Sequence, residues 1–414
     1  MRNLYFYLIV VFFVLHFVWA QILSYLNRTR MSPLMPKELE GIYDPEEYAK
    51  QQMYQKENDR FKLVSGGFSF VVSAAVLWYG GIGWLDTFLR GYTGSSVLLM
   101  LAFFGVICVL CQIMAIPFDW YDTFVIEQKY GFNKTTPRTF VLDQIKTLAL
   151  FLVLAGVVLT IVLVVYEYAA DRFWLLSWAA VSVLSLIIAF FYSEWIVPIF
   201  NKQTPLEEGE LRSAIEAFAQ KASFPVRNIY VIDGSKRSTK SNAYFTGFGK
   251  KKRVVLYDTL RDDLSTEEIV AVLAHEIGHY KMKHIFYIIA MSMANTGFVL
   301  WAFSFFLDSP AIAQALGGMT PSFHLGMVGF SLLYSPLSGI LDLAVHYSSR
   351  KHEYQADKFA AGYGIGDALI AALKKISSKS LTNLTPHPVV VFCCYSHPTL
   401  LQRIHHVQTS RQYR

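Results

Sequence analysis

The sequence predicts a polytopic α-helical membrane protein that carries one α+β insertion. Of its 414 residues, 54% are hydrophobic and only 16% are charged, which is too apolar for a soluble protein of this length. Apolar runs of about 20 residues recur along the chain, and a run of that length crosses the hydrocarbon core as a helix. The formal net charge of +6 is modest and lies mostly between these runs, which suits lipid headgroups and argues against a nucleic-acid partner.

Seven apolar runs are long enough to span a membrane. They cover residues 4–25, 67–85, 96–117, 147–166, 173–193, 285–307 and 324–346. The last run contains Pro336, Gly339 and Asp342, so we expect it to be kinked and to line a polar space rather than lipid. The chain then divides into 1–199 with five membrane helices, 200–284, 285–346 with two membrane helices, and 347–414.

Basic residues between the spans predict the orientation of the chain. Segments 26–66 and 118–146 are rich in Lys and Arg, whereas segment 308–323 contains neither. Because Lys and Arg gather on the cytoplasmic side of a membrane, the N-terminus is expected outside. The 200–284 insertion and the C-terminal segment 347–414 are then both cytoplasmic.

The insertion has the pattern of an α+β unit. Helical periodicity over Leu206–Ser223 is followed by a strand-like run at Asn228–Ile232. Two further strand-like runs, Asn242–Phe248 and Arg253–Tyr257, are separated by a turn and predict a hairpin. This hairpin precedes the helix that carries the most specific motif of the chain.

That motif is His275-Glu-Ile-Gly-His279, on a helix whose start is marked by a Ser265/Glu268 capping box. Four residues are just over one helical turn, so both imidazoles project from one face and can bind a single Zn²⁺. Glu276 is rotated by about 100° from His275 and is placed to act as a general base beside the metal. The alternative is a chance match among 11 histidines, which composition alone produces in roughly 1% of such chains.

A zinc site of this type needs a third protein ligand, and the segment around Glu353 offers one. Glu353 and Asp357 are four residues apart, so if Glu353 binds the metal, Asp357 shares its face and can accept the outer N–H of a ligating histidine. His352 is a competing ligand, but it is rotated by about 100° and would leave Asp357 off the metal-facing side. Without a metal, the same stretch would be a solvated charged helix.

Six segments together resemble one known family, the membrane-integrated zinc CaaX prenyl proteases of the sterile-24 type. The segments are Glu127–Asn133, Ser235–Phe248, Arg253–Leu260, His275–His279, Ser349–Asp357 and Tyr395–Pro398. The resemblance extends over nearly the whole chain, and seven spans agree with the family's count. It implies a gluzincin-like metalloprotease domain on a barrel of helices that encloses a large water-filled chamber.

The resemblance also implies roles for individual residues. One Zn²⁺ per chain would be held by His275, His279 and Glu353, with Glu276 as the general base and Asp357 as the orienting carboxylate.

Four further residues match positions of the family that contact the peptide. His397 would face the scissile carbonyl, and Arg403 would bind substrate from the helix just after it. Asn242 and Ala243 would line the strand edge that takes the peptide.

Two features depart from the family pattern. Gly339 stands where an acidic residue is common, and Asp342 one turn later is a candidate replacement. The ending Arg411–Arg414 lacks the lysine-rich retrieval signal of an endoplasmic-reticulum enzyme, which favours a bacterial inner membrane.

Three classes of function were weighed. A zinc endopeptidase that cleaves near the C-terminus of CaaX-type (prenylated) or other membrane-associated peptides accounts for the histidine pair, the second ligand helix and the seven spans. A membrane quality-control zinc protease of broader specificity would use the same chemistry but is expected to have fewer spans and no Asn242 segment. A non-enzymatic transporter accounts for the spans only. The expected partners are a peptide or lipidated protein and membrane lipids, and the sequence leaves the oligomeric state open.

Overall fold

Seven long apolar helices form the larger part of the computed structural model, which describes residues 2–32, 34–37, 40–224, 226, 228–246 and 253–412. The predicted number of spans is therefore confirmed within these residues. The seven helices are α1 (Leu4–Arg28), α2 (Pro45–Trp78), α4 (Ser96–Tyr121), α5 (Pro137–Tyr168), α6 (Phe173–Phe191), α11 (His284–Ser304) and α13 (Phe323–Gly362). Shorter helices are α3 (Gly81–Arg90), α7 (Val197–Phe200), α9 (Asp258–Asp263), α12 (Pro310–Ala315) and α15 (Pro388–Cys394).

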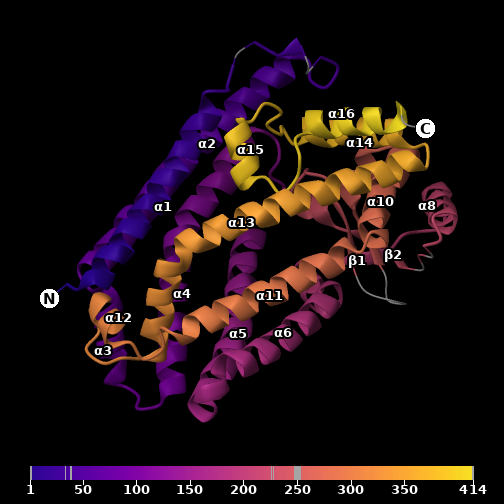
Figure 1. Ribbon diagram of the computed structural model, residues 1–414. Helices are drawn as coiled ribbons and strands as arrows, with labels where there is room; N and C mark the ends of the chain where they lie inside the picture. The colour runs from indigo at the N-terminus through magenta and orange to yellow at the C-terminus, as the bar shows by residue number, and fades with distance from the viewer. Residues whose placement is uncertain are drawn as a thin grey trace.

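The seven helices form a closed ring. Each helix contacts the next one in chain order, and α13 contacts α1. Helix α2 makes its contact with the π-helical continuation of α4 at Asp122–Glu127. Figure 1 shows α1 and α2 along one side, α6 and α11 along the other, and α13 between them. The most apolar stretch of each helix buries between 0% and 17% of its residues, whereas a solid bundle would bury the inward face of each helix. The helices are therefore loosely packed along much of their length, although α4 and α13 contact each other directly, and the enclosed chamber stays a prediction.

The second span differs from its predicted position. The apolar run at 67–85 is divided between two helices, because α2 ends at Trp78 and α3 begins at Gly81. Between them Gly80 has a φ of 70°, a left-handed conformation that ends the helix and that glycine adopts readily. The span is supplied by α2 instead, which starts much earlier, at Pro45 with Asp44 as its N-cap.

Helix α13 runs through the predicted boundary at residues 346/347 without a break. Pro336 lies inside it, and Figure 1 shows the helix changing direction in its first half, as expected where a proline removes a backbone hydrogen bond. A Cβ at Gly339 would meet no atom within 4 Å, and Asp342 lines a cavity of about 610 Å³ between α11 and α13. Asp342 therefore lines a cavity as expected, but the lining of this cavity is mostly apolar, and the segment around Glu353 belongs to a membrane helix.

A four-stranded sheet accompanies the ring, with the strand order β1-β2-β4-β3. The hairpin pairing of β3 (Ala243–Thr246) with β4 (Arg253–Tyr257) is antiparallel, as predicted, and its turn at residues 247–252 lies outside the described residues. Strand β2 (Asn228–Ile232) pairs parallel to β4, and β1 (Gln203–Pro205), which was not predicted, pairs antiparallel to β2. Strand β3 is thus an edge strand.

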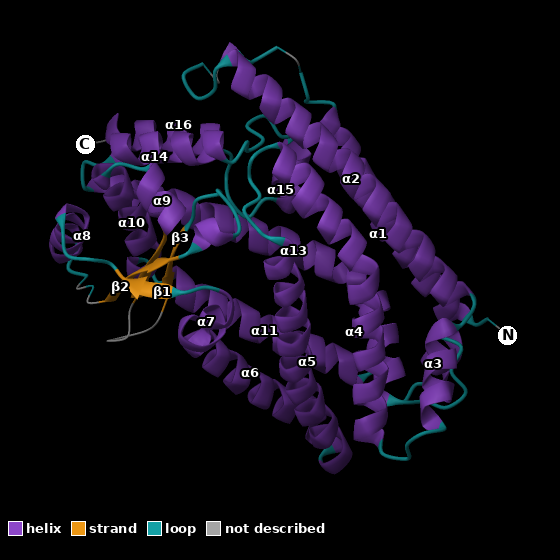
Figure 2. Cartoon of the chain, turned by 180° about the vertical axis from the view of Figure 1, so that it is seen from behind, coloured by secondary structure: helices purple, strands orange, loops and turns teal. Residues whose placement is uncertain are grey.

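The insertion and the C-terminal segment share one hydrophobic core. Helices α8 (Glu210–Lys221), α10 (Thr266–Lys281), α14 (Gly366–Lys379) and α16 (Leu400–Gln412) pack with the sheet, and Figure 2 shows them gathered with it near the C-terminus. Core side chains from both segments include Leu256, Ile269, Ala274, Ala360 and Val407. Two parts of the chain that lie far apart in sequence therefore build a single unit at one end of the ring.

Candidate metal centre

Helix α10 carries the histidine pair close to α13. Ser265 accepts a hydrogen bond from the amide of Glu268, and the Glu268 carboxylate accepts one from the amide of Ser265, so the predicted capping box is present. One turn before the end of α10, a Cβ added at Gly278 would lie 3.1 Å from the Ala356 Cα and 3.1 Å from the Phe359 Cβ. The glycine of the motif is therefore what lets the two helices approach closely enough to share a site.

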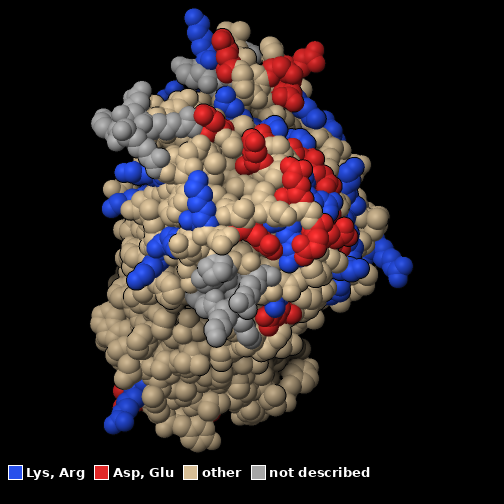
Figure 3. Space-filling model, turned by 90° about the vertical axis from the view of Figure 1, so that its right-hand side faces the viewer, with Lys and Arg blue, Asp and Glu red and all other residues tan. Residues whose placement is uncertain are grey.

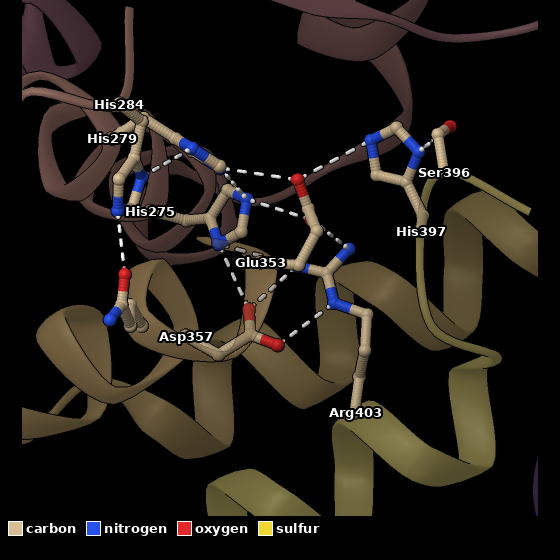
Figure 4. A network of polar contacts seen from close by, with 9 residues as sticks. His275, His279, His284, Glu353, Asp357, Ser396, His397 and Arg403 are labelled. Carbon is tan, nitrogen blue, oxygen red and sulfur yellow. Dashed lines mark hydrogen bonds and ion pairs between the residues drawn. The ribbon is translucent and has the colours of Figure 1, made fainter. Parts of the chain in front are cut away.

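Three donor groups converge where the helices meet. The Nε2 atoms of His275 and His279 are 3.1 Å apart, and the Glu353 carboxylate oxygens lie 3.4 Å from the first and 3.2 Å from the second. Ligand atoms of these three residues all lie within 4.8 Å of one another, in the one such group of three or more found among the described residues. Figure 4 shows the three side chains facing a common point.

The donor set fits a divalent cation. Two imidazole nitrogens and one carboxylate are the ligands that zinc hydrolases use, with the fourth position left open. Glu353 is 5% exposed, and its Oε2 atom has no hydrogen-bond partner among the described residues. A buried carboxylate oxygen that has only the His275 Nε2 at 3.4 Å and the Arg403 Nη1 at 3.5 Å is poorly satisfied, and a cation between the histidines would satisfy it.

Asp357 lies directly behind His275 and is fully buried. The Nδ1 atom of His275 is 2.9 Å from an Asp357 oxygen, the contact expected of a carboxylate that orients a metal ligand. Burial and the Arg403 guanidinium lower the pKa of His275, but hydrogen bonds to Asp357 and Glu353 outweigh them and raise this pKa to about 9. The carboxylates thus give the site the negative potential that a cation requires.

Arg403 occupies a different place from the one predicted for a substrate-binding residue. Its Nε and Nη2 atoms donate to the two oxygens of Asp357 at 2.9 and 2.6 Å, and Nη1 lies 3.5 Å from Glu353. The side chain is only 11% exposed. A bidentate pair of this kind fixes a carboxylate in position, so Arg403 holds Asp357 beneath the histidine pair instead of reaching the open side of the site.

The remaining predicted residues lie beside Glu353, on α10, or at the start of a strand that packs against α10. His397 is 63% exposed, its Nε2 lies 3.4 Å from Glu353, and its Nδ1 is 2.9 Å from the Ser396 hydroxyl. Glu276 is partly exposed on α10, and Asn242 and Ala243 lie at the start of the edge strand β3, against which α10 packs.

Two residues beside the donor group, His284 and Gln355, were not predicted from the sequence. The Nδ1 atoms of His284 and His279 are 3.0 Å apart, and the Nε2 atom of His284 is 2.8 Å from the Oε1 atom of Gln355. His352, weighed as a competing ligand, lies outside the donor group and stacks on His284 with ring centroids 4.1 Å apart. A third histidine five positions after His279 was the only available signal.

Comparisons with known proteins agree with this geometry. Residues 23–202 match a family model described as the CAAX prenyl protease N-terminal region with five membrane helices, and residues 205–411 match peptidase family M48. The chain belongs to peptidase family M48. It is therefore an integral-membrane metalloprotease, and the transporter alternative is set aside.

The relatives cover the chain almost completely. A rice CAAX prenyl protease 1 homolog is 33% identical over 91% of each chain, and the yeast Saccharomyces cerevisiae CAAX prenyl protease 1 is 33% identical over 95% of this chain and 93% of its own. A human CAAX prenyl protease 1 homolog is 30% identical over 96% and 94%. The crystal structure of S. mikatae Ste24p superimposes with a TM-score of 0.92 at 31% identity, over 98% of this chain and 99% of that one. These relatives are eukaryotic and lend no support to the expected bacterial inner membrane.

Proposed function

We propose that this metalloprotease is a zinc endopeptidase that cleaves near the C-terminus of CaaX-type prenylated peptides and proteins. The observation that carries the proposal is the convergence of His275, His279 and Glu353, two of them on the helix α10, which packs against the edge strand β3. The names of the relatives supply the substrate class. The seven spans and the strand that follows Asn242 both disfavour the quality-control alternative, for which fewer spans and no Asn242 segment were expected.

His275, His279 and Glu353 would hold one Zn²⁺ per chain. A zinc ion in this position supplies a Lewis acid that polarises the scissile carbonyl and makes an attacking water more acidic. Asp357 holds the first histidine through its Nδ1 atom, and Arg403 fixes Asp357. Both lie on the closed side, so the open side is left for substrate.

The peptide would bind as an added strand along β3. The carbonyl of Asn242 accepts a hydrogen bond from the Tyr257 amide of β4, so the main-chain groups of Ala243 point the other way, toward the free edge. The Ala243 amide is occupied by the Asn242 side chain at 2.9 Å, a contact that a peptide carbonyl can replace. Main-chain pairing of this kind gives affinity with weak sequence preference, which suits the processing of different protein termini.

Two side chains would then act on the bound peptide. Glu276 takes a proton from the attacking water and delivers it to the leaving amine, as expected of the glutamate between the two histidines. His397 donates from its Nε2 atom to the developing oxyanion, since it is exposed and reaches the edge of the donor group.

The catalytic unit would face the cytoplasm. In Figure 3 charged side chains cover the upper part of the molecule, toward the start of α2 and helices α14 and α16, and the lower part is nearly free of them. The three loops at that other end contain two basic residues, Arg90 and Arg172. The positive-inside rule therefore places the metal centre and the C-terminus inside and the N-terminus outside.

Mass-spectrometric mapping of the cleavage of a farnesylated CaaX peptide by purified protein tests the proposal. We expect cleavage after the prenylated cysteine, its loss with a chelator and its return with added zinc. Glu276→Gln keeps the size of the side chain but removes the base, so turnover should fall at least about a hundredfold while zinc stays bound. Wild-type turnover by the zinc-loaded variant, or cleavage that survives complete chelation, would disprove the mechanism.

A further inference from the structure

His284 lies beside the metal centre, and the proposed mechanism gives it no role. It is the first residue of α11, three residues beyond the end of α10, and it is 3% exposed. Lys283 before it has a φ of 60°, a left-handed conformation that is unusual for a residue other than glycine. This turn directs the chain back, so that the His284 ring lies beside His279, as Figure 4 shows.

The hydrogen bonds around His284 define where each proton lies. The Nε2 atom of His284 is 2.8 Å from the Gln355 side-chain carbonyl oxygen, which can only accept, so this Nε2 carries a proton. The Nδ1 atom of a neutral His284 is then an acceptor. It is 3.0 Å from the Nδ1 atom of His279, which must therefore be the donor.

The consequence for His279 follows from its own two nitrogens. With the proton on Nδ1, the lone pair of Nε2 is free, and this is the atom that faces His275 and Glu353. A metal ligand needs that tautomer.

Helix α13 supplies both supports of His284. Gln355 accepts its Nε2–H, and the ring of His352 stacks on it at 4.1 Å with an interplanar angle of 15°. These two residues are three positions apart and share a face of the helix, next to the face that carries Glu353 and Asp357. One helix therefore contributes a ligand, the partner of the first histidine and, through His284, the partner of the second.

We propose that His284 is a positioning residue of the metal centre, which fixes His279 in its metal-binding tautomer and orientation by accepting the hydrogen bond of its Nδ1–H. The inference rests on the metal site proposed above. It assigns the two histidine ligands different partners, a carboxylate for His275 and a neutral imidazole for His279.

The test measures zinc affinity of purified, metal-depleted protein by competition with a chromophoric chelator. His284→Phe keeps an aromatic ring on His352 but removes the acceptor, and we expect its zinc affinity to fall by about 10–100-fold. His284→Asn places an amide oxygen close to the position of Nδ1, so it should recover most of that loss. His346→Phe on α13 is the matched control, because it makes the same change of ring at a histidine outside the donor group, and its affinity should equal that of the wild type.

Three outcomes would overturn the inference: wild-type zinc affinity in His284→Phe, equal losses in the Phe and Asn variants, or a comparable loss in the control. If His284→Phe does not fold, the zinc affinities of Gln355→Leu and Gln355→Glu are compared instead. Only Gln355→Leu removes the acceptor that fixes His284, so only its affinity should fall. Equal affinities in that pair would also refute it. His279→Ala separates the two proposals. Zinc retained there would disprove the metal site itself, whereas zinc lost there but unaffected in His284→Phe would disprove the positioning role alone.

Discussion

Gly278→Ala should weaken zinc binding although it adds a single methyl group. The new Cβ would lie 3.1 Å from the Ala356 Cα and the Phe359 Cβ, whereas ordinary contacts begin at 3.4 Å, so α10 and α13 must separate by about 0.3 Å or more. Metal sites tolerate about 0.2 Å in their ligand distances, and the donors here come from both helices. Overpacking of this kind costs about 1–3 kcal/mol, which lowers zinc affinity by about 5–150-fold if it falls on the metal-bound state.

The same substitution should lower the free energy of unfolding by no more than about 2 kcal/mol. Alanine favours a helix over glycine by about 1 kcal/mol, which offsets part of the steric term. Zinc affinity is measured by chelator competition and folding by thermal unfolding of the same preparation. Gly339→Ala on α13 is the control, because its Cβ meets no atom within 4 Å, and it should bind zinc normally. Wild-type zinc affinity in Gly278→Ala would show that the approach of the helices does not set the ligand geometry.

Three further predictions concern the site and the topology. His279→Ala should lose zinc, whereas Asp357→Asn should weaken binding by about 10–100-fold; stoichiometric zinc in the first variant, by metal analysis, would contradict the ligand assignment. His397→Ala should raise the free-energy barrier of the reaction by about 2.7–4 kcal/mol and so lower kcat, with zinc content unchanged. An unaltered kcat would disprove the oxyanion role of His397. Met319 is 86% exposed in the loop before α13, so Met319→Cys in a cysteine-free background should react with an impermeant maleimide on intact cells; reaction only after permeabilisation would invert the topology.

Local patterns predicted the parts of the site that lie within one helix. The spacing of His275 and His279 and the capping box at Ser265 were sufficient to place the motif on α10, and the four-residue spacing of Glu353 and Asp357 predicted their shared direction. Each of these inferences needs only the geometry of a helix.

Tertiary contacts account for what the sequence analysis missed. The approach of His284 to His279 depends on the left-handed turn at Lys283, which no periodicity encodes. Arg403 was expected to bind substrate from its match to a family position, and its pairing with Asp357, 46 residues away on another helix, leaves no mark in the sequence. The strand β1 is three residues long, too short for a period-two pattern, and is defined by its pairing with β2.

The contact between α1 and α13 can form only late in the synthesis of the chain. These helices are the first and the last of the ring, and about 295 residues separate the end of α1 at Arg28 from the start of α13 at Phe323. At a synthesis rate of about 5–20 residues per second, α1 waits in the membrane for roughly 15–60 s before its neighbour emerges. During that interval the face of α1 that packs against α13 has no partner. Lipid or the insertion machinery must cover it until α13 arrives, so mutations in α13 should act on the yield of inserted protein as well as on catalysis.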